Sequence, residues 1–378
     1  MSIEDKPTVW LIGAGFSRSL GGPLFADLFR PRFQGDDEQL FPLKQYPTLA
    51  RDLYVSRLHY NAGKDEGWWR DAEDFLAFLD SAYRNVDGPK KGMLRMLGKR
   101  VRSKLPGAKK MTPDYAHAWF LSSPVAVRRA LAAECSAFLL DLDDTEECWH
   151  PYREWAKSLR PEWDTVISFN YDRVLEHLAT KDAPKLKVLL PSDCPNDGSP
   201  LTGDVVPVLK LHGSVDWKRD KDGPVQLGDV KQILASETEA PFIAAPGRSK
   251  QDAVKELGPL WKQARWALEH AGALVVLGYG FPVTDTKARI EIQSAFSSGS
   301  TGPDARRIDV VLGPDTSKPE VRRVHALLEG FKGPRSVVVA PEKVPPRGLY
   351  QIGALFIRPH YLWAEDFIFD YGQRTKGA

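Results

Sequence analysis

The residues best suited to chemistry in this sequence are small or polar, and they follow short apolar runs. The first group comes directly after residues 8–12 and consists of Gly13, Ala14, Gly15 and Ser17. Small residues let backbone N–H groups approach a diphosphate, and the start of a following helix adds a favourable dipole. The full pattern G-x-G-x-x-G is not met, so two readings stay open: a phosphate cradle, or a tight turn that needs glycine for its backbone conformation.

A second group of candidates is polar and lies later in the chain. Asn170 and Asp172 occur in "SFNYD", and His212 occurs in "LKLHGSVDW". A third stretch, "GYGFPVTD" (residues 278–285), again joins glycines to polar residues. The alternative readings are structural, because Asn-x-Asp is also common in turns and helix caps, and a lone histidine at a strand end often only packs.

The elements that position these residues are short runs rich in Val, Leu and Ile. Such runs occupy residues 8–12, 164–170, 205–213, 272–280 and 307–313, and helical patterns at 257–270 and 286–296 separate several of them. Alternation of strands and helices predicts a parallel sheet that is covered on both faces. Ligands bind at the carboxyl ends of such strands, so we expect the candidate residues to meet there.

The predicted fold is therefore an α/β, doubly wound, Rossmann-like core with a large helical insertion. We expect the core at residues 1–25 and 161–330 and the insertion at residues 26–160. Within the insertion, helices are predicted at 71–83 and 126–142, with Pro124 marking the start of the second. Residues 331–378 include a strand-like run at 337–340 and are expected to pack on the core.

Composition excludes several classes of protein. The net charge of +2 does not favour a protein coated with nucleic acid, and the three dispersed cysteines cannot form a four-cysteine zinc module. We expect no metal. The sequence also shows no secretory signal and no apolar run of the ~20 residues that a membrane helix needs, so a cytoplasmic protein is expected.

One family resemblance emerges from these motifs taken in order. "GAGFSRSLGGPLF" resembles the sirtuin signature in which Gly-Ala-Gly-x-Ser is followed by Gly-x-Pro-x-Phe, here ending at Phe25. "SFNYD" and "LHGS" resemble the sirtuin elements that carry the Asn, the Asp and the catalytic His. Together with "GYGFPVTD", the set is most similar to the prokaryotic sirtuin-like branch associated with antiphage defence. The resemblance covers residues 8–25 and 163–315.

The resemblance implies an NAD pocket. In it, Asn170 and His212 would flank the nicotinamide ribose and Asp172 would shape the pocket. The remaining implied contacts are to the pyrophosphate from Gly13, Ala14, Gly15 and Ser17, to the nicotinamide end from Phe25, and to the adenosine half from Gly278, Tyr279 and Gly280. The sequence departs from the family at Ala26, where an arginine is frequent, at Gly280, where a serine is frequent, and in "VVLGPD", which lacks the expected asparagine.

The implied activity is NAD glycohydrolysis, which yields nicotinamide and ADP-ribose and would deplete NAD in antiviral defence. Two alternatives stay open: an NAD-dependent protein deacylase or ADP-ribosyltransferase, and a non-catalytic subunit that binds NAD or ADP-ribose. Because unrestrained NAD hydrolysis would harm the host, we expect gating by homo-oligomerisation or by a separately encoded partner, for which the family suggests a motor-type ATPase.

The family resemblance gives no role to one charged stretch of the sequence. It begins at Lys90, ends at Lys110, and holds nine basic residues and no acidic one. It is either a surface helix with a solvated basic side, or a contact for nucleic acid or an acidic partner.

Overall fold

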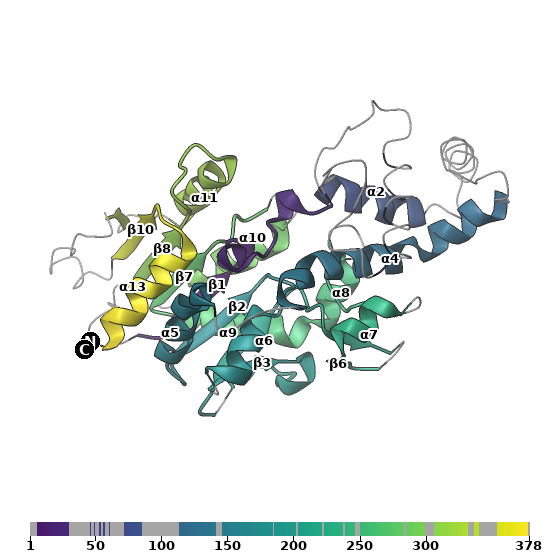
Figure 1. Ribbon diagram of the computed structural model, residues 1–378. Coiled ribbons are helices and arrows are strands. Elements are labelled where there is room, and N and C mark those ends of the chain that lie inside the picture. Colours follow the sequence, from purple (N-terminus) through teal and green to yellow (C-terminus); the bar gives the residue numbers. More distant parts are fainter. Residues whose placement is uncertain are drawn as a thin grey trace. The chain divides into compact units, whose positions relative to one another are not determined.

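The computed structural model describes residues 6–29, 46, 49, 53, 56, 60, 72–84, 113–140, 146–183, 185–201, 203–220, 223–236, 239–245, 250–282, 285–298, 306–331, 336–339 and 354–376. Figure 1 labels the helices and strands of the chain, which divides into two units. The first comprises Met1–Gly22, Leu142–His212 and Glu256–Ala378, and the second comprises Pro23–Asp141 and Gly213–Lys255. The second unit thus combines most of the stretch expected as an insertion with residues 213–255, which the sequence suggested were part of the core.

The first unit is built on a parallel sheet of eight strands, ordered β3-β4-β2-β1-β7-β8-β10-β9. The predicted α/β class with a doubly wound parallel sheet is confirmed. The strands are β1 (Thr8–Ile12), β2 (Asp164–Ser168), β3 (Leu186–Leu189), β4 (Val206–Lys210), β7 (Ala273–Leu277), β8 (Arg306–Val311), β9 (Ser336–Val338) and β10 (Leu355–His360). Counting outward from β1, the strands β2, β4 and β3 lie on one side, and the strands β7, β8, β10 and β9, which come later in the chain, lie on the other. The carboxyl end of β1 is therefore the topological switch point, where such sheets bind ligands.

Two of the eight described strands of this sheet, β3 and β10, were missed by the sequence prediction. β3 has only four residues, and one of them is a lysine, so its apolar signal is short. β10 contains Arg358, Pro359 and His360, which interrupt the apolar run that marked the other strands. Since proline lacks the N–H that a sheet ladder uses, a run with a proline is normally demoted as a strand.

Helices cover both faces of the sheet. They are α5 (His150–Ser158), α6 (Val174–Lys181), α9 (Gly258–His270), α10 (Thr286–Ser298), α11 (Pro319–Glu329) and α13 (Ala364–Lys376). Neighbouring residues of β8 point to opposite faces. Arg306 donates to Leu268 O, near the end of α9, and to Phe296 O in α10, whereas Arg307 pairs with Asp309 beneath α13. On the α13 face, the Trp10 ring of β1 contacts Trp155 of α5 and Tyr371 of α13 edge-on.

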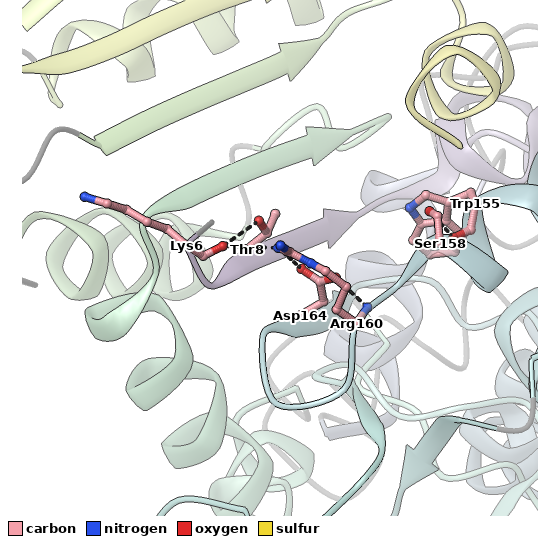
Figure 2. A network of polar contacts seen from close by, with 6 residues as sticks. All are labelled: Lys6, Thr8, Trp155, Ser158, Arg160 and Asp164. Carbon is pink, nitrogen blue, oxygen red and sulfur yellow. Dashed lines mark hydrogen bonds and ion pairs between the residues drawn. The ribbon is translucent and has the colours of Figure 1, made fainter. Parts of the chain in front are cut away.

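A polar cluster closes the amino-terminal edge of the sheet (Figure 2). Arg160 donates to both carboxylate oxygens of Asp164, at 3.3 and 3.4 Å, and to the backbone oxygen of Lys6 at 3.2 Å. Thr8 Oγ1 also donates to Lys6 O. Burial raises the pKa of the Asp164 carboxyl group, while the contacts with Arg160 lower it. This cluster joins the start of β1 to the start of β2, at the edge of the sheet opposite the candidate site.

A second cluster joins β8 to β10 around one buried carboxylate. Arg358 donates to both oxygens of Asp309, at 2.7 and 2.8 Å, and His360 Nε2 lies 2.8 Å from the same carboxylate. Arg307 Nε lies 2.7 Å from Asp309 Oδ2. Burial by itself would raise the pKa of Asp309, but His360 and the two arginines lower it to about 2. Asp309 therefore supplies the negative charge that balances the two arginines in this part of the sheet, under α13.

Asp309→Asn is expected to destabilise the first unit by roughly 2 kcal/mol at neutral pH, because a pKa lowered by about two units stabilises the folded state by that amount. The ordinary pKa of 3.8 is lowered to about 2 in the folded state. The stabilisation is therefore present above about pH 4 and is lost as the pH falls toward about 2. Urea denaturation at several pH values checks this prediction. The difference in the free energy of unfolding between the variant and the wild type should shrink as the pH falls from 4 to 2. Asp370→Asn, on the exposed side of α13, is the control, and an equal loss there would contradict the prediction.

The second unit contains helices and a short hairpin. Its described elements are η4 (Phe25–Asp27), α2 (Ala72–Arg84), α4 (Pro113–Leu140), β5 (Trp217–Arg219), β6 (Val225–Leu227), α7 (Val230–Ala235) and α8 (Lys250–Glu256), of which the last ends in the first unit. α2 matches its prediction, but α4 begins at Pro113, so the prediction that Pro124 starts this helix was wrong. The described helix runs continuously through Pro124, which therefore lies inside it. The basic stretch from Lys90 to Lys110 lies outside the described residues.

Candidate functional site

The site predicted from the sequence lies at the carboxyl ends of four neighbouring strands. These strands are adjacent in the order β4-β2-β1-β7 and all run parallel. The predicted residues follow them: Gly13, Ala14, Gly15 and Ser17 after β1, Asn170 and Asp172 after β2, His212 after β4, and Gly278, Tyr279 and Gly280 after β7. Phe25 belongs to the second unit, where it starts η4 and is half-buried.

The glycines after β1 and β7 allow two turns to pack against each other. A Cβ on Gly13 would lie 2.5 Å from Tyr279 Cα, and a Cβ on Gly15 would lie 2.7 Å from Gly278 Cα. Gly278 has φ +62°, and a Cβ there would lie 2.5 Å from the Gly15 backbone. Any side chain at these positions would push the two turns apart, so the glycines fix the base of the site.

The backbone N–H groups of the β1 turn are mostly used within the protein. Gly13 donates to Leu277 O at the end of β7 and Gly15 donates to Gly278 O just after it, while Phe16 and Ser17 donate within the turn itself. Among the described residues, the Ala14 amide has no acceptor, which makes it the donor of this turn that a ligand could use. The turn continues into two short 3-10 helices, η2 (Ala14–Phe16) and η3 (Arg18–Leu20). The expected α-helix start, with its dipole, is therefore absent from this described segment.

Ser17 connects the two polar residues that follow β2. Asn170 Nδ2 donates to Ser17 Oγ at 3.2 Å and to Gly13 O at 3.1 Å, and Ser17 Oγ donates to Asp172 Oδ2 at 2.8 Å. All three side chains are buried. Because the amide nitrogen of Asn170 is held by the β1 turn, the orientation of its carboxamide is fixed. The amide oxygen accepts no hydrogen bond from the described residues, so it is the atom of Asn170 suited to a ligand.

The two carboxylate oxygens of Asp172 accept hydrogen bonds from two different parts of the chain, the β1 turn and the start of α6. Val174 N, at the start of α6, donates to Asp172 Oδ1 at 3.1 Å. Burial raises the pKa of Asp172, and the positive charge of Lys210 is the largest of the opposing influences, followed by the Val174 N–H and the Ser17 hydroxyl. Asp172 therefore links the β1 turn, the β2 loop and α6 as a shared acceptor.

Beneath this loop lies a buried ion pair that the sequence interpretation missed. Lys210, the last residue of β4, is fully buried, and its Nζ lies 2.7 Å from Glu176 Oε1 of α6. The same Nζ donates to the backbone oxygen of Asp172 at 2.5 Å. The available signal was a lysine inside the apolar run "VLKLHG", because lysine is almost never fully buried unless it is paired.

His212 lies in an aromatic environment beside a second carboxylate. Its Nε2 is 3.5 Å from Asp285 Oδ1, and both side chains are buried. Phe169 meets the His212 ring edge-on at 4.9 Å between ring centroids and stacks on Tyr279 at 4.4 Å. The Tyr279 hydroxyl donates to Asp285 Oδ2 at 2.9 Å. Asp285 was quoted in the motif "GYGFPVTD" but was given no role.

The other residues predicted after β7 have structural contacts of their own. Burial raises the pKa of Tyr279 above its usual range, so its hydroxyl keeps its proton and acts as a donor. The backbone oxygen of Gly280 accepts from Arg323 Nε of α11 at 2.8 Å. The turn after β7 is therefore held at two points, by the Tyr279 side chain and by the Gly280 backbone.

No group of three or more His, Cys, Asp or Glu side chains in the described ranges is arranged to hold a metal ion. No helix in that part of the chain combines the length and the apolar character needed to cross a bilayer.

The fold and the site together define an α/β protein with a doubly wound parallel sheet and a buried Asn–Ser–Asp and His–Asp arrangement at its switch point. No protein-family model matches the chain, and no curated protein matches it.

Proposed function

We propose that this protein is an NAD glycohydrolase that cleaves NAD to nicotinamide and ADP-ribose. The observation that carries the proposal is the arrangement of Asn170 and His212, which are buried at neighbouring strand ends beside the β1 turn. The Asn170 carboxamide is oriented by the turn, and His212 is placed beside a carboxylate. An NAD pyrophosphate would be bound by the β1 turn through the Ala14 amide, and the short 3-10 helices would contribute no macrodipole.

The chemistry needs little more than these groups. Cleavage of the bond between ribose and nicotinamide develops positive charge on the sugar, as in glycoside hydrolysis. Because the pyridinium is already a good leaving group, no strong acid is required. In this mechanism the Asn170 amide oxygen orients water or a ribose hydroxyl, and His212 accepts a proton near neutral pH.

The purified protein is expected to convert NAD to nicotinamide and ADP-ribose in equal amounts, in whatever assembled form it requires. Chromatography of a timed incubation measures both products, and an added acetylated peptide tests the deacylase alternative. Cleavage should continue in the presence of chelators, because the leaving group needs no Lewis acid. NAD that stays intact across all protein concentrations and assembly states would contradict the proposal.

We further propose that the protein acts as an NAD-depleting effector in cytoplasmic antiviral defence and that its assembly controls it. A host that carries a free NAD hydrolase must keep the enzyme inactive until it is needed. Self-association or a separately encoded motor-type ATPase would supply that control, with the stretch from Lys90 to Lys110 as a candidate contact for a partner or nucleic acid. If the dilute monomer cleaves NAD at the full rate, this gating is excluded.

A further inference from the structure

Asp285 occupies a position from which it can act on His212. It comes directly before α10, and its backbone is fixed because Asp285 N donates to Pro282 O and Asp285 O accepts from Arg289 N. One carboxylate oxygen faces His212 Nε2 at 3.5 Å, and the other accepts from the Tyr279 hydroxyl. Since β7 and α10 hold this carboxylate while β4 carries His212, the contact joins two separate parts of the first unit.

The aromatic residues around the pair restrict how it can move. Phe169 contacts both His212 and Tyr279, and its ring is nearly parallel to that of Tyr279, at 12°. Tyr171 lies over the His212 ring at 6.1 Å between ring centroids. An imidazole in such a cage has few ways to rotate, so a carboxylate beside its Nε2 favours the ring proton on that nitrogen.

We propose that Asp285 is a positioning residue for His212: it keeps the ring proton on Nε2, so that Nδ1 carries the lone pair that accepts a proton. Tyr279 orients Asp285 by donating to its second oxygen. The inference rests on the proposed function in making His212 the base, but the contact between the two side chains can be tested without any substrate.

Several charged and titratable groups adjoin this pair, and the test must account for them. Tyr279 and Tyr171 adjoin Asp285 and His212 directly. Arg289 of α10 and Arg323 of α11 act on Tyr279 by their charge. Of these groups, Asp285 is the one that supplies a negative charge to the imidazole.

The first measurement uses the unmodified protein with isotopically labelled histidine. The chain has eight histidines, and the spectrum of His212→Gln identifies the signals of His212. The ¹⁵N shifts of the two ring nitrogens report which one is protonated in the neutral form. We expect the proton on Nε2, and a proton on Nδ1 would overturn the proposal.

The second measurement follows the titration of His212 in Asp285→Asn, which keeps the shape and removes the charge. The midpoint should fall by about one pH unit, because a neighbouring carboxylate favours the charged imidazolium. Asp285→Glu, which keeps the charge, should leave the midpoint of the His212 titration close to its wild-type value. Asp182→Asn is the matched control, since Asp182, at the end of α6, pairs with Arg153 of α5. An unchanged midpoint in folded Asp285→Asn would overturn the proposal.

Kinetics then separate this inference from the function on which it rests. In Asp285→Asn, kcat should fall about tenfold or more while KM for NAD stays within about twofold, as expected when a base is wrongly oriented. The acid limb of the pH–rate profile should move to lower pH together with the His212 midpoint. A shifted midpoint in a protein that cleaves no NAD would refute the proposed function and still support the role of Asp285.

Discussion

Asn170→Ala is expected to lower NAD cleavage by about 100-fold or more, with the fold unchanged. The Asn170 side chain donates to Gly13 O and Ser17 Oγ of the β1 turn, and it also contributes a hydrogen bond that lowers the pKa of Asp172. Its removal takes away the oriented amide oxygen while leaving Ser17 bonded to Asp172. His212→Ala should lower the rate to a similar extent, since a positioned base contributes about 10²- to 10⁴-fold.

Matched variants make this result specific to the site. Asn196→Ala changes an exposed asparagine after β3, and His270→Ala changes an exposed histidine at the end of α9. Both should cleave NAD at the wild-type rate. Circular dichroism and thermal unfolding of all four variants would show whether the fold is intact. Normal turnover in folded Asn170→Ala and His212→Ala would remove both residues from the mechanism.

The sheet could be predicted because its strands carry strong local signals. Residues 8–12 match β1 without error, and the runs after it overlap β2, β4, β7 and β8. A short run that is mostly Val, Leu, Ile or Trp and is bounded by small or polar residues predicts a buried strand where such runs alternate with helices. The adjacency of β4, β2, β1 and β7 then follows from the rules of doubly wound sheets.

The support beneath the site could not be predicted, because it depends on side chains that are distant in the sequence. Ser17 and Asp172 are 155 residues apart, and Lys210 and Glu176 are 34 apart. Sequence patterns report local structure, whereas such contacts follow from packing. Ser17 illustrates the difference: the motif suggested a phosphate ligand, but its hydroxyl joins Asn170 to Asp172. Asp285 likewise stood in a quoted motif, but nothing in the sequence indicated that it lies beside His212.

Lys210→Met is expected to destabilise the first unit by about 3–5 kcal/mol, which is the usual cost of breaking a buried ion pair. Methionine nearly preserves the volume of the lysine stem, so the loss arises from leaving the Glu176 carboxylate buried without its cation. The double variant Lys210→Met/Glu176→Leu should recover most of the stability, because an apolar pair of similar volume is often no less stable than the ions it replaces. Lys262→Met, at an exposed lysine of α9, serves as the control. Urea denaturation measures all three variants.

Activity in the double variant decides whether Lys210 does more than balance a charge. Its Nζ holds the backbone oxygen of Asp172, and its charge opposes the rise that burial causes in the pKa of Asp172. Without Lys210 the loop that carries Asn170 and Asp172 loses its anchor on β4, and Asp172 becomes a weaker acceptor for Ser17 at neutral pH. We therefore expect NAD cleavage to stay at least about tenfold below wild type even where stability returns, since small misplacements of reacting groups are costly. Full recovery of both stability and turnover would mean that the ion pair serves the fold alone.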